Sequence, residues 1–73
     1  MVYFNDDSAI TTKIKAKLFA DDSLSGFAIS VDTFKGEVTL TGAVKTSEQK
    51  ELASTIALSV NGIKKVNNLL KLK

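Results

Sequence analysis

Apolar residues recur along the chain with two different periods, and the first of these is the period of a helix. Ile10, Ile14 and Leu18 stand four residues apart, which places them in one narrow stripe on a helix. Acidic residues precede this stretch and favour a helix start, whereas Asp21-Asp22 oppose its continuation. The pattern therefore predicts a helix over residues 7–20.

A strict alternation over residues 27–44 is typical of two antiparallel strands joined by a tight turn. Between the two alternating runs stands Lys35-Gly36, and Gly36 can adopt the positive φ that a two-residue hairpin turn needs. This turn pairs Phe34 with Glu37, Thr33 with Val38, Val31 with Leu40, Ile29 with Gly42, and Phe27 with Val44. Every apolar strand residue except Phe34 then lies on one face, which indicates a well specified register.

A second helix is predicted after Thr46, because Thr46 and Gln49 have the spacing of a capping box. Its broad apolar face consists of Gln49, Leu52, Ala53, Ile56, Ala57 and Val60. Gly62 is expected to end this helix in the left-handed position just past the cap, with Ile63 as the hydrophobic contact.

The C-terminal residues predict a third strand, whose inward side chains are Val66, Leu70 and Leu72. Asn68 falls on the same inward face and is an exception to the pattern. The resulting order is helix, strand, strand, helix, strand, an α+β fold in which both helices cover one face of a three-stranded mixed sheet. A right-handed crossover makes the second and third strands parallel, but the pattern leaves open whether they are neighbours.

The composition excludes most catalytic chemistry. The chain has 73 residues, enough for one small domain, and it contains neither His nor Cys. The commonest general base, the commonest metal ligands and any disulfide are therefore missing. Adjacent acids such as Asp21-Asp22 are typical of caps and solvated turns, and no calcium-binding loop motif is present. We expect no catalytic residues, no metal and no cofactor.

The basic residues favour an anionic surface over a nucleic acid as partner. All ten are lysines, and the formal net charge is +2. Lysine acts as a point charge suited to loose attraction, whereas reading of phosphates and guanine edges typically uses arginine. The glycines do not have the G-x-x-G spacing of a KH-type RNA-binding loop. We therefore expect no nucleic-acid partner.

Lysines on the first predicted helix are the sharpest candidates for a binding site. Lys13 and Lys17 flank the apolar stripe on one side and Lys15 on the other, and Phe19 points partly outward. Such lysines can lay their stems over the core while their ammonium groups reach the anionic headgroups of phospholipids. The alternative is a solvated helix flank.

Other candidate contacts lie elsewhere along the chain. Lys64 and Lys65, just before the third predicted strand, are candidates to add to the lipid contact. Leu58 on the outer side of the second helix, together with the aromatic Tyr3-Phe4, is a candidate contact for a protein partner or a neighbouring domain. The alternative is ordinary exposed surface.

Motifs from several of these segments together form one combination. They are the Ile10, Ile14, Leu18 spacing, Ile29-Ser30-Val31, the G-x-V-x-L-x-G-x-V run from Gly36 to Val44, Ala53 and Ala57, Val60-Asn61-Gly62-Ile63, and Val66 to Leu70. The combination resembles the bacterial OsmY and nodulation (BON) domain family over residues 8–72. The hairpin turn is two residues longer than in the shortest version of the family.

The resemblance implies a phospholipid-binding or interaction module of the bacterial envelope without catalytic residues. Family members are mostly periplasmic and often hold two copies of the domain. The resemblance thus implies that residues 1–73 form one domain of a longer chain, with a second such domain or an envelope protein as a further partner. The first residues lack the charged and apolar regions of a signal peptide.

The glycines of the motif are expected to be structural. Gly36 supplies the turn, and Gly62 ends a helix. Gly42, opposite Ile29, would let a helix approach the sheet closely.

Overall fold

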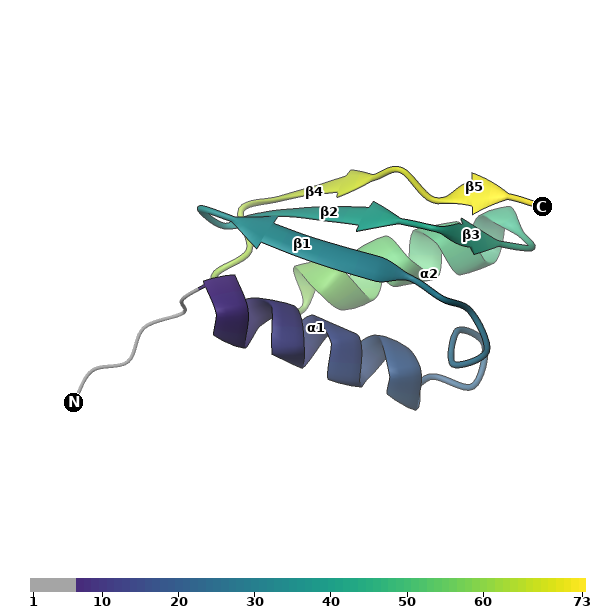
Figure 1. Cartoon of the computed structure of the whole chain (residues 1–73), viewed down its shortest axis with the longest axis horizontal. Coiled ribbons are helices and arrows are strands. Elements are labelled where there is room, and N and C mark those ends of the chain that lie inside the picture. The colour runs from purple at the N-terminus through teal and green to yellow at the C-terminus, as the bar shows by residue number, and fades with distance from the viewer. Residues whose placement is uncertain (1–6) are drawn as a thin grey trace.

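The structure, a computed structural model, describes residues 7–73. Both helices pack against one face of the sheet, and the other face is left open (Figure 1). The elements are α1 (Asp7–Ala20), β1 (Ser30–Phe34), β2 (Glu37–Thr41), β3 (Ala43–Val44), α2 (Ser47–Leu58), β4 (Lys65–Asn68) and β5 (Lys71–Leu72). The predicted α+β architecture is confirmed, although the second and third predicted strands are each divided in two. Neither of these helices is long and apolar enough to cross a membrane.

The β1–β2 hairpin has the predicted register throughout both strands. Lys35 and Gly36 form its turn with φ of 51° and 82°. Positive φ at both positions is the mark of a type I′ turn, whose twist matches that of the flanking strands. β1 begins only at Ser30, so the pairs predicted for Phe27 and Ile29 lie outside the ladder, although Ile29 still lies beside Gly42.

Gly42 divides the second predicted strand into β2 and β3. Its φ is 128°, and a Cβ placed on it would lie 2.5 Å from the carbonyl oxygen of Ala28. The prediction that a helix approaches the sheet at Gly42 is therefore wrong, since the chain leading into β1 fills that place. The chain bends at Gly42. Beyond this bend, β3 pairs with β5 and not with β1.

The parallel strands β2 and β4 are neighbours, which decides the point that the pattern leaves open. Val38 stands opposite Val66, and Leu40 opposite Asn68. The pairing continues toward β5, where the Lys71 N–H donates to the carbonyl of Gly42 at 2.9 Å. The chain segment after α2 thus lies along the whole length of β2 and β3.

α2 begins as predicted and ends earlier than predicted. The Gln49 N–H donates to Thr46 Oγ1 at 3.1 Å, and the Thr46 N–H donates to Gln49 Oε1 at 3.2 Å, which completes the capping box. The helix ends at Leu58, and the Ser59 hydroxyl donates to the carbonyl of Ile56 at 2.6 Å. Gly62, with φ of 97°, lies in the turn that follows and is not the residue just past the cap.

The core lies between the helices and the sheet, and no polar or charged side chain is buried in the described part of the chain. It consists of Ile10, Ile14, Leu18, Leu24, Ile29, Val31, Val38, Leu40, Val44, Ala53, Ala57, Val60 and Leu70. Leu24 is fully buried although it stands alone in a polar loop, where no periodic pattern could predict it. Leu72, predicted to point inward, is 50% exposed because β5 forms the rim of the sheet (Figure 1).

Asn68, the polar exception on the inward face of the last predicted strand, forms hydrogen bonds with both ends of its amide. Its Nδ2 donates to the Lys50 carbonyl at 2.7 Å and to the Ser54 hydroxyl at 2.6 Å. Its Oδ1 accepts the Leu70 N–H at 3.1 Å. The side chain therefore joins α2 to the outer strand of the sheet at the gap between β4 and β5.

Candidate functional site

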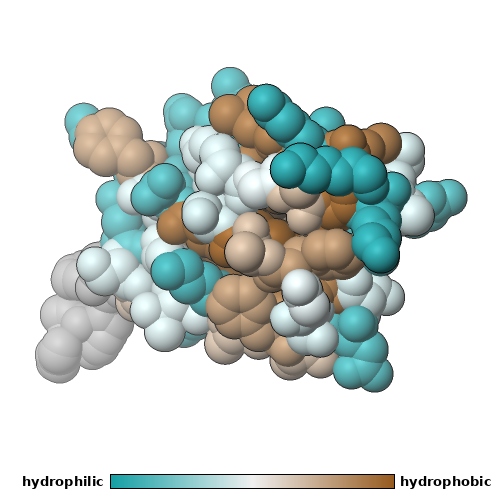
Figure 2. Space-filling view, turned by 45° about the vertical axis from the view of Figure 1, so that its right-hand side comes forward, coloured by the Kyte–Doolittle hydropathy of each residue, from teal (hydrophilic) through white to brown (hydrophobic). Residues whose placement is uncertain are grey.

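α1 has an exposed apolar face in addition to the buried one. The stripe predicted from the sequence is buried against the sheet. At about 100° per residue, Thr12, Ala16 and Phe19 fall on the opposite side of the helix. All three are exposed, as is Ala20, and Phe19 keeps 47% of its surface accessible. Figure 2 brings the C-terminal end of α1 forward, and apolar side chains reach the surface at the level of this helix.

Lysines border this outer face of α1 on both sides. Lys13 and Lys17, one helical turn apart, lie on one flank, and Lys15 lies on the flank toward β1. All three side chains are exposed, and the structure of residues 7–73 shows no salt bridge to any of them. The three lysines thus frame an exposed helix face and do not form a single cluster.

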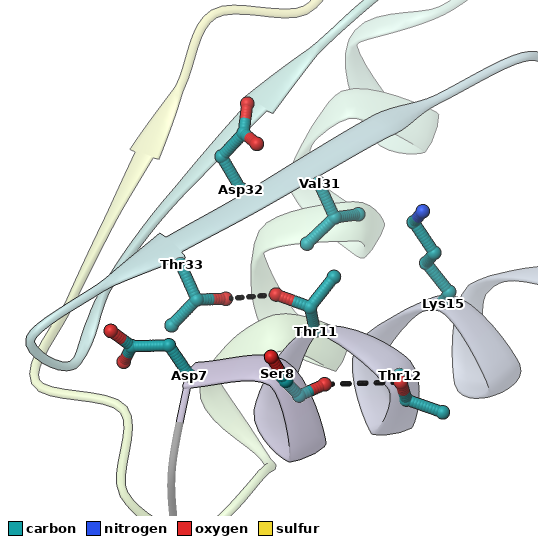
Figure 3. A pocket seen from close by; sticks show the side chains of 8 residues that line it. All are labelled: Asp7, Ser8, Thr11, Thr12, Lys15, Val31, Asp32 and Thr33. Atoms are coloured by element: carbon teal, nitrogen blue, oxygen red, sulfur yellow. Dashed lines mark hydrogen bonds between the residues drawn. The ribbon is translucent and has the colours of Figure 1, made fainter.

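A shallow groove of about 430 Å³ separates the Lys15 flank of α1 from the edge strand β1 (Figure 3). It is lined by Asp7, Ser8, Thr11, Thr12, Lys15, Val31, Asp32 and Thr33. The Thr11 and Thr33 hydroxyls bond to each other across the groove at 2.8 Å. The Thr12 hydroxyl donates to the carbonyl of Ser8 at 3.0 Å. These threonine hydroxyls are therefore engaged within the protein.

The charges of the groove are mixed. Asp7 Oδ2 accepts the N–H of Lys35 at 3.1 Å and so joins the start of α1 to the hairpin turn. Asp32 points away from the helix side of β1, whereas Lys15 reaches out from α1 (Figure 3). No group of three or more acidic side chains in residues 7–73 is arranged to hold a metal ion. The groove offers polar surface but neither a nucleophile–base pair nor a metal site.

Lys64 and Lys65 do not join the lysines of α1 but lie beside the hairpin turn. The N–H groups of both residues donate to the carbonyl of Gly36, at 2.8 Å and 3.4 Å. Lys65 also stands opposite Glu37 in the sheet. Lys35, in the turn itself, completes a group of three lysines at this end of the molecule.

The predicted apolar contacts are separated in space. Leu58, 56% exposed, is the last residue of α2, whereas Phe19 lies near the end of α1, at the opposite end of the helix layer (Figure 1). Tyr3-Phe4 lies outside the described residues. Phe34, next to the hairpin turn, is 69% exposed. In the alternation of the hairpin, Phe34 is the exception to the apolar face, and that departure is the sequence signal of an exposed contact residue.

Together, these features define a small two-layer αββαβ domain with an apolar interior and a lysine-bordered helix on its surface. The family model of the BON domain matches residues 6–73. The chain belongs to the BON domain family.

Named relatives agree with this assignment, and a solved structure has a similar fold. The chain is 45% identical over 67 residues to the osmotically-inducible protein Y of Escherichia coli and 38% identical over 65 residues to the outer membrane lipoprotein DolP of Haemophilus influenzae. These matches cover 92% and 89% of the chain, which spans about a third of the length of each relative. The fold is similar to the C-terminal domain of CdsD, a structural protein of the type III secretion system of Chlamydia trachomatis. The TM-score is 0.75, with 24% identity over 92% of the chain and 33% of that chain.

Proposed function

We propose that the chain is a non-catalytic module of the bacterial envelope that binds anionic phospholipid surfaces through α1. The observation that carries this proposal is the exposed outer face of α1 around Ala16 and Phe19, bordered by Lys13 and Lys17 on one flank and by Lys15 on the other. An exposed aromatic ring flanked by lysines can enter the headgroup region while the ammonium groups meet anionic headgroups. The similarity to an outer membrane lipoprotein supports the envelope as its location.

The expected binding is weak and reversible. Each lysine near an anionic surface contributes about 1 kcal/mol, so three lysines contribute about 3 kcal/mol at low ionic strength. Phe19 exposes only half of its surface, and Ala16 and Ala20 are small. Burying Phe19 therefore adds only about 1–1.5 kcal/mol. Electrostatic attraction dominates, and the affinity should fall steeply with added salt.

Co-sedimentation with phosphatidylglycerol vesicles tests this proposal. The double variant Lys13→Glu/Lys17→Glu should weaken binding by at least about thirtyfold, because it removes two lysines worth about 1 kcal/mol each and reverses the charge of one flank of the exposed helix face. The matched control is Lys71→Glu/Lys73→Glu, which changes the net charge equally on exposed residues of the C-terminal strand region. Equal loss of binding in both variants, or in neither, would rule out α1 as the contact.

A second candidate function is protein interaction through Leu58. Its side chain is 56% exposed at the end of α2 and is therefore accessible to a partner. Leu58→Asp should then weaken self-association or partner binding with little dependence on salt. Analytical ultracentrifugation of the wild-type chain and the Leu58→Asp variant measures self-association without lipid and so distinguishes this function from lipid binding.

A further inference from the structure

The hairpin turn forms an exposed aromatic and basic end of the molecule, which we call the hairpin end. It consists of Phe34, Lys35, Lys64 and Lys65. Phe34 is 69% exposed, the largest exposed fraction among the exposed large hydrophobic residues of the described chain. The Lys35 ammonium lies 5.3 Å from the centre of the Phe34 ring, within the range of a cation–π contact. The two residues thus expose an apolar ring with a cation above it.

The backbone holds the hairpin end in a fixed position. The type I′ turn is closed by Phe34 and Glu37, which pair in the sheet. Asp7 accepts the Lys35 N–H at 3.1 Å, which joins the turn to the start of α1. Gly36 accepts the Lys64 N–H at 2.8 Å, and a Cβ on Gly36 would lie only 3.1 Å from the Lys64 side chain. Because the turn is held from both sides, little conformational entropy is lost when a ligand binds there.

The hairpin end has a small positive excess, with Lys35, Lys64 and Lys65 against the carboxylates of Asp7 and Glu37. The three lysines come from two segments that are far apart in the sequence, Lys35 from the hairpin turn and Lys64-Lys65 from the point where β4 begins. Two carboxylates lie near these lysines. One of these, Asp7, is engaged by the backbone N–H of Lys35. The other, Glu37, stands between Phe34 and Lys65 in the sheet. The lysines are exposed and form no salt bridge within residues 7–73.

We propose that the hairpin end is a second contact site for anionic phospholipid, separate from α1, in which the Phe34 ring enters the headgroup region. This inference rests on the proposed function. An aromatic ring at the tip of a rigid turn suits the membrane interface, because its apolar body is buried while adjacent lysines meet the headgroups. The site lies where α1 begins, whereas Phe19 lies near the end of α1 (Figure 1).

Tryptophan fluorescence tests the hairpin end directly, because the chain contains no Trp. Phe34→Trp places a single reporter in an exposed position, and its emission should shift to the blue with phosphatidylglycerol vesicles but not with phosphatidylcholine vesicles. Adding Lys35→Asn to this variant should lower the partition coefficient about fivefold, the effect of one lysine near an anionic surface. Asn favours the left-handed conformation of residue 35, so this variant keeps the turn.

The matched reporter is Phe19→Trp, which monitors α1 in the same vesicles. If the wild-type chain co-sediments and only the reporter at residue 19 responds, the hairpin end is not a lipid contact while the proposed function stands. If neither reporter responds and the wild-type chain does not sediment, both proposals fail. An equal response of Phe34→Trp to both lipids would overturn the role of the lysines. Thermal denaturation of each variant verifies that it is folded.

Discussion

Asn68 offers the sharpest test of the packing, because the sequence pattern and the structure make opposite predictions for it. The alternation of the last strand favours an apolar residue here, so Asn68→Leu would stabilise the protein if the pattern alone decided. The structure predicts the reverse. The amide makes three hydrogen bonds of 2.6–3.1 Å at a partly buried position.

The size of the effect follows from those three bonds. Each hydrogen bond contributes about 1 kcal/mol net, so Asn68→Leu or Asn68→Ala should lower the free energy of unfolding by about 2–3 kcal/mol. A chain of 73 residues has a total stability of about 4–11 kcal/mol, so a large part would be lost. For a domain of this size, the melting temperature should fall by roughly 10–20 °C.

Urea denaturation followed by circular dichroism measures this loss. The slope of the free energy against urea should stay unchanged, because the buried surface is nearly the same. Asn67→Ala is the matched control, since Asn67 lies on the open face of the sheet and its side chain makes no hydrogen bond in the described structure. A melting temperature of Asn68→Leu equal to or above that of the wild type would refute the reasoning.

Two further changes test the core and the bend in the sheet. Ile14→Ala should destabilise the protein by about 2–5 kcal/mol, because Ile14 is fully buried, and the same urea titration measures it. Gly42→Ala should cost about 1–3 kcal/mol, because φ is 128° and the added Cβ meets the Ala28 carbonyl oxygen. Gly26→Ala is the matched control for Gly42→Ala. Nothing lies within 4 Å of the Cβ position of Gly26, so a near-neutral effect on stability is expected.

The candidate sites differ in how far the sequence could reveal them. The positions of Lys13, Lys15 and Lys17 relative to the buried stripe of α1 follow from helical periodicity and can be predicted from the sequence. The hairpin end could not be found in this way. Its lysines meet only because β4 begins beside the turn of the β1–β2 hairpin, and the alternation does not specify which strand lies next to which.

Periods along the chain determined the local elements, namely both helices, the hairpin register and the capping box, because each depends on residues a few positions apart. Tertiary structure alone decided the contacts between distant segments. The β2–β4 pairing, the burial of Leu24 and the bonds of Asn68 to α2 have no periodic signal. The bend at Gly42 is of the same kind, because the obstacle to a side chain there is the backbone of Ala28, fourteen residues earlier. Whether a given position is open or filled depends on neighbours that only the folded chain brings together.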